Sequence, residues 1–195
     1  MSRPPAPPRL RRIAAPAAAL TGLALLVGGC SNTTALPAPA FTNVVDTVSL
    51  FALSDTNVQQ PSAFDLLSAQ RVRTDQTTAL DFAFNFDSTG RPALFPTGAL
   101  HLGLLSGLQQ TTQAFDSVKL APTGGYVFDQ PMVVDAGTVV LVRSRPTTCL
   151  FGATVSQYAK LRILGVDSTA RRVDFQILVD QNCGYRGLEP GLPKQ

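Results

Sequence analysis

Alternation of large apolar residues with small or polar ones is the feature that most limits the fold of this chain. Residues 80–87 alternate in this way, and their large members are Leu80, Phe82, Phe84 and Phe86. A period of two puts successive side chains on opposite faces of a β-strand, so these four share one face. The same period recurs in residues 158–163 and 173–180. All three segments are therefore predicted to be strands with one face toward a core.

Other apolar runs predict further strands. Residues 138–142 are β-branched nearly throughout, which favours a central strand buried on both faces. Additional strands are expected at residues 46–53, 93–105, 115–120 and 126–134. Pro96 and Pro131 interrupt two of these segments, which indicates strand edges or bulges there, because proline has no amide hydrogen.

The segments between the strands are rich in turn residues. Residues 87–91 (DSTGR) and 167–171 (DSTAR) share a pattern in which Asp and Ser bond local amides, so both predict hairpin turns. Residues 135–137 (DAG) are a third turn signal, and residues 61–70 are expected to form the one short helix. The chain is therefore predicted to be all-β, an antiparallel sandwich or barrel of about eight to ten short strands with at most one short helix.

The N-terminus has the composition of an export signal. The basic residues of its head are Arg3, Arg9, Arg11 and Arg12. Residues 13–27 are almost wholly apolar, and two glycines precede Cys30. A basic head, a short apolar run and a small-residue cleavage site are typical of a signal peptide, and the run is too short for a permanent span of roughly 20 residues.

Val27-Gly28-Gly29-Cys30 resembles the lipobox of bacterial lipoprotein precursors. The resemblance implies that residues 1–29 are a signal peptide removed by cleavage between Gly29 and Cys30. It also implies diacylglycerol on the Cys30 sulfur and acylation of the new amine, which together anchor a protein stably in a membrane. The absence of Asp at position 31 implies sorting to the outer membrane, facing the periplasm or the cell surface. The alternative is an ordinary secretory signal followed by a chance cysteine.

Cleavage at Cys30 changes what the composition implies. Residues 30–40 would be the lipidated cysteine and a Pro-interrupted flexible tether, and residues 41–195 a single β-rich domain. The whole chain has a formal net charge of +3, but losing four arginines leaves twelve basic residues against thirteen acidic ones, a net of −1. No basic surface is expected, so nucleic acid is excluded as a partner.

The cysteines point to an oxidising compartment. With Cys30 lipidated, Cys149 and Cys183 remain as an even pair in an exported chain, and we predict that they form a disulfide. Two free buried thiols are the alternative. A metal site is disfavoured because the sequence has no Cys-x-x-Cys and no histidine near either residue.

Few residues could carry catalysis. His101 is the single histidine and is expected on the polar side of a strand, where it would be solvated. Glu189 is the single glutamate, and Asp81 and Asp87 would stand about 20 Å apart at the two ends of one strand, too far for paired carboxylate chemistry. No catalytic, cofactor-binding or metal-binding residue is predicted, no cofactor is expected, and the protein is expected not to be an enzyme.

The remaining charged residues have structural interpretations. Residues 180–184 (DQNCG) look like the start of a calcium loop but lack its closing Glu, so a turn is expected. Lys160 and Arg162 are expected to face solvent on one strand, and Asp174 and Asp180 to face solvent on the next strand. The doublets Arg71 with Arg73 and Arg143 with Arg145 could bind an anion, although solvated edge positions are the default.

Residues 157–163 (QYAKLRI), followed by a turn and residues 173–175 (VDF), resemble the C-terminal hairpin of the HmuY-like haemophore lipoproteins. The resemblance implies a lipid-anchored, β-rich domain that scavenges haem. That family holds haem iron with two histidines, whereas this chain has only His101. A pair of histidine ligands within one molecule is therefore impossible.

Three functions follow as hypotheses. The first is a lipid-anchored envelope lipoprotein whose non-catalytic β-domain binds a partner protein or an envelope component. The second is a haemophore-like lipoprotein that binds a small molecule. The third, and weakest, is an enzyme that uses aspartates, since no other acid or base is available in numbers. In each case the membrane is a partner through the lipid on Cys30.

Overall fold

Twelve β-strands and one 3₁₀ turn make up the part of the chain that the computed structural model describes, which is residues 37–149 and 152–193. In chain order they are β1 (Val45–Phe51), β2 (Ala63–Asp65), β3 (Gln70–Val72), β4 (Phe82–Phe86), β5 (Pro92–Pro96), β6 (Gly107–Thr111), η1 (Phe115–Ser117), β7 (Met132–Val133), β8 (Val139–Arg143), β9 (Thr147–Thr148), β10 (Thr154–Val155), β11 (Tyr158–Asp167) and β12 (Arg172–Asp180). Among the described residues, no helix is long and apolar enough to cross a membrane.

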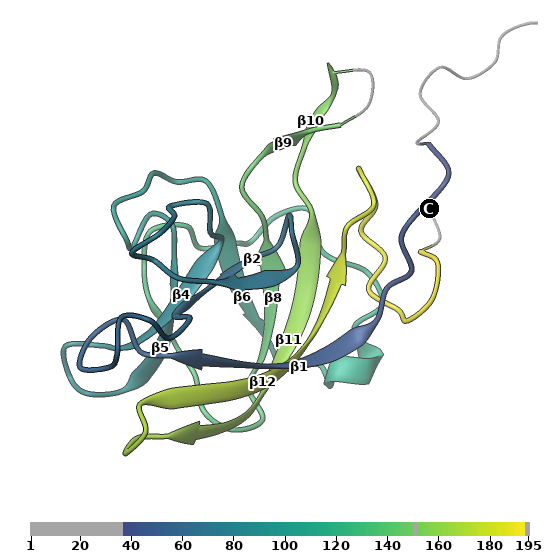
Figure 1. Ribbon diagram of the computed structural model, residues 1–195. Coiled ribbons are helices and arrows are strands. Elements are labelled where there is room, and N and C mark those ends of the chain that lie inside the picture. The colour runs from purple at the N-terminus through teal and green to yellow at the C-terminus, as the bar shows by residue number, and fades with distance from the viewer. Residues whose placement is uncertain (1–36, 150–151, 194–195) are drawn as a thin grey trace, which may run out of the picture. The chain divides into compact units, whose positions relative to one another are not determined.

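The strands form two five-stranded antiparallel sheets and a separate hairpin (Figure 1). The first sheet has the order β1-β12-β11-β8-β6, the second has the order β3-β2-β4-β5-β7, and β9 pairs only with β10. The two large sheets form a sandwich and not a closed barrel, which confirms the predicted fold class. The number of strands exceeds eight to ten because β2, β3, β7, β9 and β10 have only two or three residues each.

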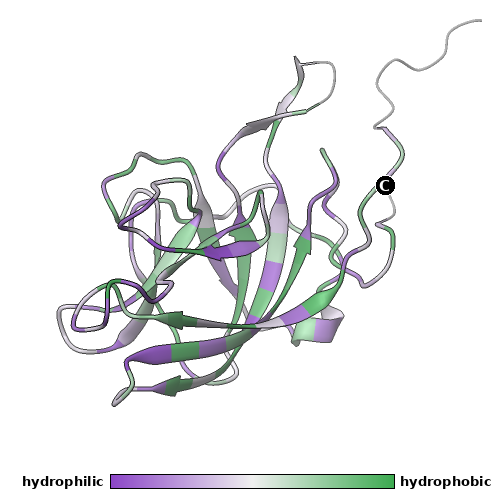
Figure 2. Cartoon of the chain, in the orientation of Figure 1, coloured by the Kyte–Doolittle hydropathy of each residue, from purple (hydrophilic) through white to green (hydrophobic). Residues whose placement is uncertain are grey.

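The main core lies between the two sheets and is built by the predicted alternation. Its large side chains come from β1, β2, β4, β5, β6, β8, β11 and β12. The alternation is visible as changing colour along β11 and β12 (Figure 2). Phe82 packs against Phe64 and Phe175 with ring centroids 5.7 and 6.0 Å apart, so aromatic contacts join β4 to β2 in its own sheet and to β12 in the other. Strand β8 is central and almost wholly buried, as its β-branched sequence predicts.

The outer face of the first sheet is covered as well, which corrects the expectation that this face is solvated. Residues 115–121 and Leu188 pack over it, so Leu141 and Leu178 on this side are buried. Lys160 is buried with them at 2 % exposure. The cause is a long connection between β6 and β7 that folds back over the sheet, and strand alternation alone does not reveal such a cover.

The predicted turns are confirmed. Asp87 Oδ1 accepts hydrogen bonds from the amides of Thr89 and Arg91 in the β4–β5 connection, where Gly90 has φ +79°. The β11–β12 connection repeats the device, since Asp167 Oδ1 accepts from the amides of Thr169 and Ala170. In both hairpins the carboxylate takes up amides that would otherwise lack a partner.

The short helix predicted at residues 61–70 is wrong. This segment forms β2, a turn and the start of β3. Residues 62–66 are all buried, a continuous run that an amphipathic helix would not show. The turn is fixed by Asp65, whose two carboxylate oxygens accept from the Leu67 amide and the Ser68 hydroxyl. Side-chain capping of a turn has replaced the helical hydrogen bonds.

Three of the predicted strands are shorter than expected or absent. The strand expected at residues 93–105 ends at Pro96 and is followed by turns, because Leu100 and Leu102 donate their amides back to Thr97. Residues 115–120 begin with the 3₁₀ turn η1 instead of a strand. In the strand expected at residues 126–134, only Met132–Val133 is a strand, as β7. Strand β6, which the sequence did not indicate, takes the edge of the first sheet.

Candidate docking site at the open edge of the sandwich

An open slot separates strand β1 from the β2–β3 hairpin. β1 is the edge strand of the first sheet and β3 that of the second, and no hydrogen bonds pair them. The slot has a volume of about 390 Å³ between Asp46, Thr47 and Ser49 on one side and Gln70 and Arg71 on the other. A second hollow of about 320 Å³ shares residues with it and continues along β1. We name the two together the edge slot.

One side of β1 faces away from β12 and toward the edge slot. The Ala52 amide donates to Arg171 O, on the side of β12, whereas the Phe51 amide donates to Pro61 O, on the opposite side. Because backbone groups alternate along a strand, the amides of the odd-numbered residues Thr47 and Ser49 also point away from β12. The Thr47 amide is bonded 2.7 Å from Asp46 Oδ1, which is an exposed side chain of the same strand. β1 therefore keeps an edge that can accept another strand.

The rim of the edge slot is charged, and little apolar surface is exposed within it. Phe64 lies beneath the slot; the residue is 2 % exposed and its ring stacks on Phe82. Asp46 and Arg71 lie on opposite rims and both are exposed. A polar slot beside an unpaired strand edge suits an extended polypeptide better than a small apolar ligand.

A buried ion-pair network holds the far wall of the slot. Arg145 lies 2.8 Å from Asp65 Oδ1 and 3.1 Å from Asp81 Oδ2. Asp65 is the residue that fixes the β2–β3 turn, so the network ties that turn to β4 and to the end of β8. Asp81 is fully buried. We name these three residues the Arg145 network.

Asp81 was expected on the polar side of its strand, and the structure shows what that side meets. Its carboxylate accepts from the Arg145 and Leu66 amides, each at 2.7 Å, in addition to the guanidinium of Arg145. Burial raises the pKa of Asp81, and the hydrogen bonds and the charge of Arg145 oppose that rise. Every one of these donors is an N–H group, so the contacts join Asp81 to the end of β8 and to the β2–β3 turn.

The two chain ends of the domain run side by side near the N-terminal end of β1 (Figure 1). We call residues 37–43 and 182–191 the terminal strap. Asn182 is at its centre: its Oδ1 accepts from the Ala40 and Phe41 amides at 2.8 and 2.9 Å, and its Nδ2 donates to Phe41 O. Residues 37–40, expected to belong to the flexible tether, are therefore bound to the domain.

Further hydrogen bonds extend the terminal strap in both directions. Asn43 and Gly191 exchange backbone hydrogen bonds of 2.8 and 3.0 Å, and Asn43 Nδ2 donates to Gly187 O. The Tyr185 hydroxyl donates to Pro37 O at 2.8 Å. The point where the chain joins the domain is thus fixed by side chains that the sequence did not single out.

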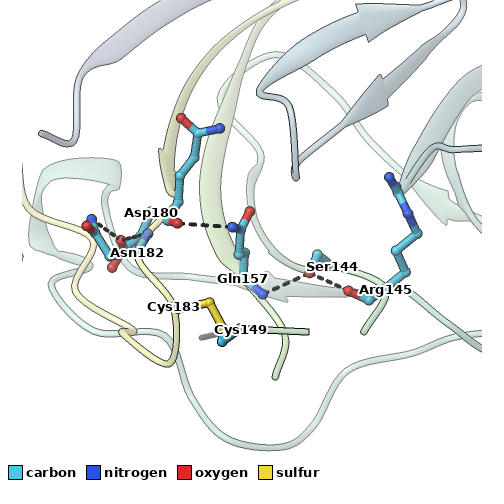
Figure 3. Close-up of a disulfide and its surroundings, with 8 residues drawn as sticks. Ser144, Arg145, Cys149, Gln157, Asp180, Asn182 and Cys183 are labelled. Carbon is cyan, nitrogen blue, oxygen red and sulfur yellow. Dashed lines mark hydrogen bonds between the residues drawn. A yellow bond between two sulfur atoms is a disulfide. The ribbon is translucent and has the colours of Figure 1, made fainter. Parts of the chain in front are cut away.

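The Cys149–Cys183 disulfide that the sequence predicts joins the terminal strap to the β9–β10 hairpin (Figure 3). The two Cα atoms are 5.9 Å apart. Asp180 lies beside the bond, where its Oδ1 accepts from the amide and the Nδ2 of Asn182. Burial raises the pKa of Asp180, and the bonds from Asn182 oppose it. Residues 180–184 are therefore a turn held by the disulfide, and not a calcium loop.

Two sequence predictions about charged residues are wrong. Lys160 is not solvated: its Nζ donates to Phe115 O and Val118 O at 2.8 and 2.9 Å and lies 4.5 Å from the centre of the Phe115 ring. Burial lowers its pKa. Asp180, expected outward on β12, is fully buried. Each of them is enclosed by a segment outside the sheets, which alternation within the sheet does not predict.

The remaining candidates lie apart from one another. His101 is exposed in the turn after β5 at φ +60°, not on a strand. Arg143 lies over the Phe128 ring and bonds Ser156, while Arg73 pairs with Asp75. The arginine doublets therefore do not converge on an anion site.

Gly29 and Cys30, the predicted cleavage and lipidation residues, lie outside the described residues. Within the described residues, no three His, Cys, Asp or Glu side chains gather where they could hold a metal ion. No known protein family matches the chain, and no curated protein is significantly similar to it. The resemblance of residues 27–30 to a lipobox and the geometry of the edge slot are therefore the features that bear on function.

Proposed function

We propose that this protein is a lipid-anchored envelope lipoprotein whose non-catalytic β-domain binds an extended segment of a partner protein in the edge slot. The observation that carries the binding function is the free edge of β1 beside an open slot. Main-chain hydrogen bonds to the edge would supply affinity, and the charged rims at Asp46 and Arg71 would select side chains. The resemblance of residues 27–30 to a lipobox supports the anchoring.

The anchoring is tested by replacing Cys30 with serine. The wild-type mature chain is expected to begin at Cys30, to carry diacylglycerol and an amide-linked acyl chain, and to fractionate with membranes. The Cys30→Ser variant is expected to lose both lipids and to leave the membrane fraction, because several acyl chains make anchoring stable and none leaves nothing to insert. Intact mass and fractionation measure this. A wild-type mature chain without lipid would contradict the proposal.

Docking at the edge slot is tested with prolines on two matched edges. Thr47→Pro removes an amide on the side of β1 that faces away from β12. Gln110→Pro removes an amide from β6, the opposite edge strand of the same sheet. The Leu108 amide points away from β8, and the Gln110 amide, two residues later, points the same way. Proline is tolerated where an edge amide faces outward, so both variants should keep their thermal stability. Thr47→Pro alone should lose partner capture, by about tenfold or more, because the proline ring blocks another strand from pairing along this side of β1.

Partner capture is measured with a photo-crosslinking amino acid at Gln70, an exposed residue on the far wall of the slot. Intact cells should yield a discrete adduct with one protein, present with Gln110→Pro and lost with Thr47→Pro. Equal adducts with both proline variants, or no protein adduct from Gln70, would overturn docking in the slot while leaving the anchoring result intact.

A further inference from the structure

We infer that the terminal strap is the membrane-facing surface of the domain, and that its exposed apolar side chains contact the lipid surface. This inference rests on the proposed lipid anchor at Cys30. It adds an orientation: one end of the domain lies against the bilayer, and the edge slot runs away from it along β1.

Apolar side chains are concentrated around the strap. Ten large hydrophobic residues are exposed among those described, and four of them lie on the strap or against it: Phe41, Val44, Leu120 and Leu192. Their exposures are 55–66 %. The Asn43–Gly191 hydrogen bonds bring residues 41–44 alongside Leu192, and Leu120 lines a hollow of about 360 Å³ together with Leu192. Exposed apolar side chains gathered in this way mark an interaction surface.

The length of chain before the strap identifies the lipid surface as the occupant. Only seven residue steps separate Cys30 from Pro37, which is bound to the domain by Tyr185. Seven residues span at most about 25 Å when fully extended, and about 14 Å on average as a flexible chain. A domain of this size has a radius of gyration of about 15 Å. The strap is therefore the part of the domain held closest to the bilayer.

The charges beside the strap do not oppose this contact. Lys119 and Glu189 form an ion pair at 3.2 Å and neutralise each other. Arg186, which bonds Ala121 O, adds a positive charge. An apolar surface with a neutral or slightly positive border is compatible with a bilayer that contains anionic lipids.

The absence of tryptophan from the sequence makes a direct test possible. Phe41→Trp and Leu192→Trp each place one reporter on the strap, and Val58→Trp places a control on the exposed loop after β1, beyond its far end. Each full-length variant is expressed, matured and reconstituted in phosphatidylethanolamine–phosphatidylglycerol vesicles with or without lipid brominated near the headgroup. Both strap reporters should be quenched about twofold or more by brominated lipid, and the control should be unaffected, because only groups at the interface reach the bromine atoms.

The outcomes separate the inference from the anchor on which it depends. Intact mass and vesicle flotation report lipidation independently of fluorescence, so an unlipidated chain that does not float overturns the proposed function together with the inference. A chain that floats but shows no quenching of the strap reporters overturns the inference alone. Reporters shielded from aqueous acrylamide but not quenched by brominated lipid would mean that a protein or a second copy covers the strap, which also overturns it.

Discussion

Replacing Arg145 by alanine is expected to lower the free energy of unfolding by about 3–5 kcal/mol. The guanidinium pairs with Asp81, which is fully buried, and with Asp65, whose side chain is 11 % exposed. Removing one member of a buried ion pair leaves the other charge desolvated without compensation, which is more damaging than removing the whole set. Urea unfolding of the mature domain measures the change.

Two variants interpret that result. Arg91→Ala breaks an ion pair with Asp87 in which the Arg91 side chain is 61 % exposed. This variant should change the free energy of unfolding by less than about 1 kcal/mol. Neutralising the Arg145 network as a unit, with Arg145→Met, Asp65→Asn and Asp81→Asn together, should recover much of the loss. A loss from Arg145→Ala no larger than that from Arg91→Ala would show that the network contributes little.

The Arg145 network also has a consequence for the edge slot. Asp65 both pairs with Arg145 and fixes the β2–β3 turn that forms the far wall, so losing the guanidinium should loosen that wall. Hydrogen exchange at Leu67 should then rise more than exchange in the β11–β12 turn, which is held by Asp167 and is independent of the network.

The features that the sequence predicted correctly are local ones. The alternation in β4, β11 and β12 needs only the period of a strand, and the Asp87 and Asp167 turns need only a carboxylate within reach of nearby amides. The disulfide followed from counting cysteines in an exported chain. Each of these depends on residues close together in sequence or on composition.

The features that the sequence missed depend on segments distant in sequence. Lys160 is buried because residues 115–121 fold over its sheet. The hairpin that forms the far wall of the slot is held by an ion pair between Asp65 and Arg145, which are 80 residues apart in sequence. The strap depends on Asn182 meeting residues 40 and 41. One local signal for the β2–β3 turn is present in the sequence: Asp65 stands three residues before Ser68. This spacing allows a side-chain-capped turn as well as the start of a helix.

Replacing both Cys149 and Cys183 by serine is expected to lower the free energy of unfolding by roughly 4 kcal/mol, the second largest effect proposed. The two residues are 34 apart in sequence. Opening a loop of that length restores conformational freedom to the unfolded chain, which stabilises the unfolded state by about this amount. The Cys30→Ser variant is the control, because it also removes a cysteine but leaves the Cys149–Cys183 disulfide intact, and its β-domain should unfold at the same denaturant concentration as the wild-type domain.

The loss should also be uneven across the domain. The disulfide joins the β9–β10 hairpin, which pairs with no other strand, to the terminal strap. Without it, amide exchange should rise most in β9, β10 and the turn at Asn182, and least in β8, an almost wholly buried strand between β11 and β6. Equal stability of the double variant and the control would show that the strap and hairpin are held by their hydrogen bonds alone. Uniformly faster exchange with lowered stability would instead show that the bond acts only on the unfolded chain and does not hold the terminal strap against the β9–β10 hairpin.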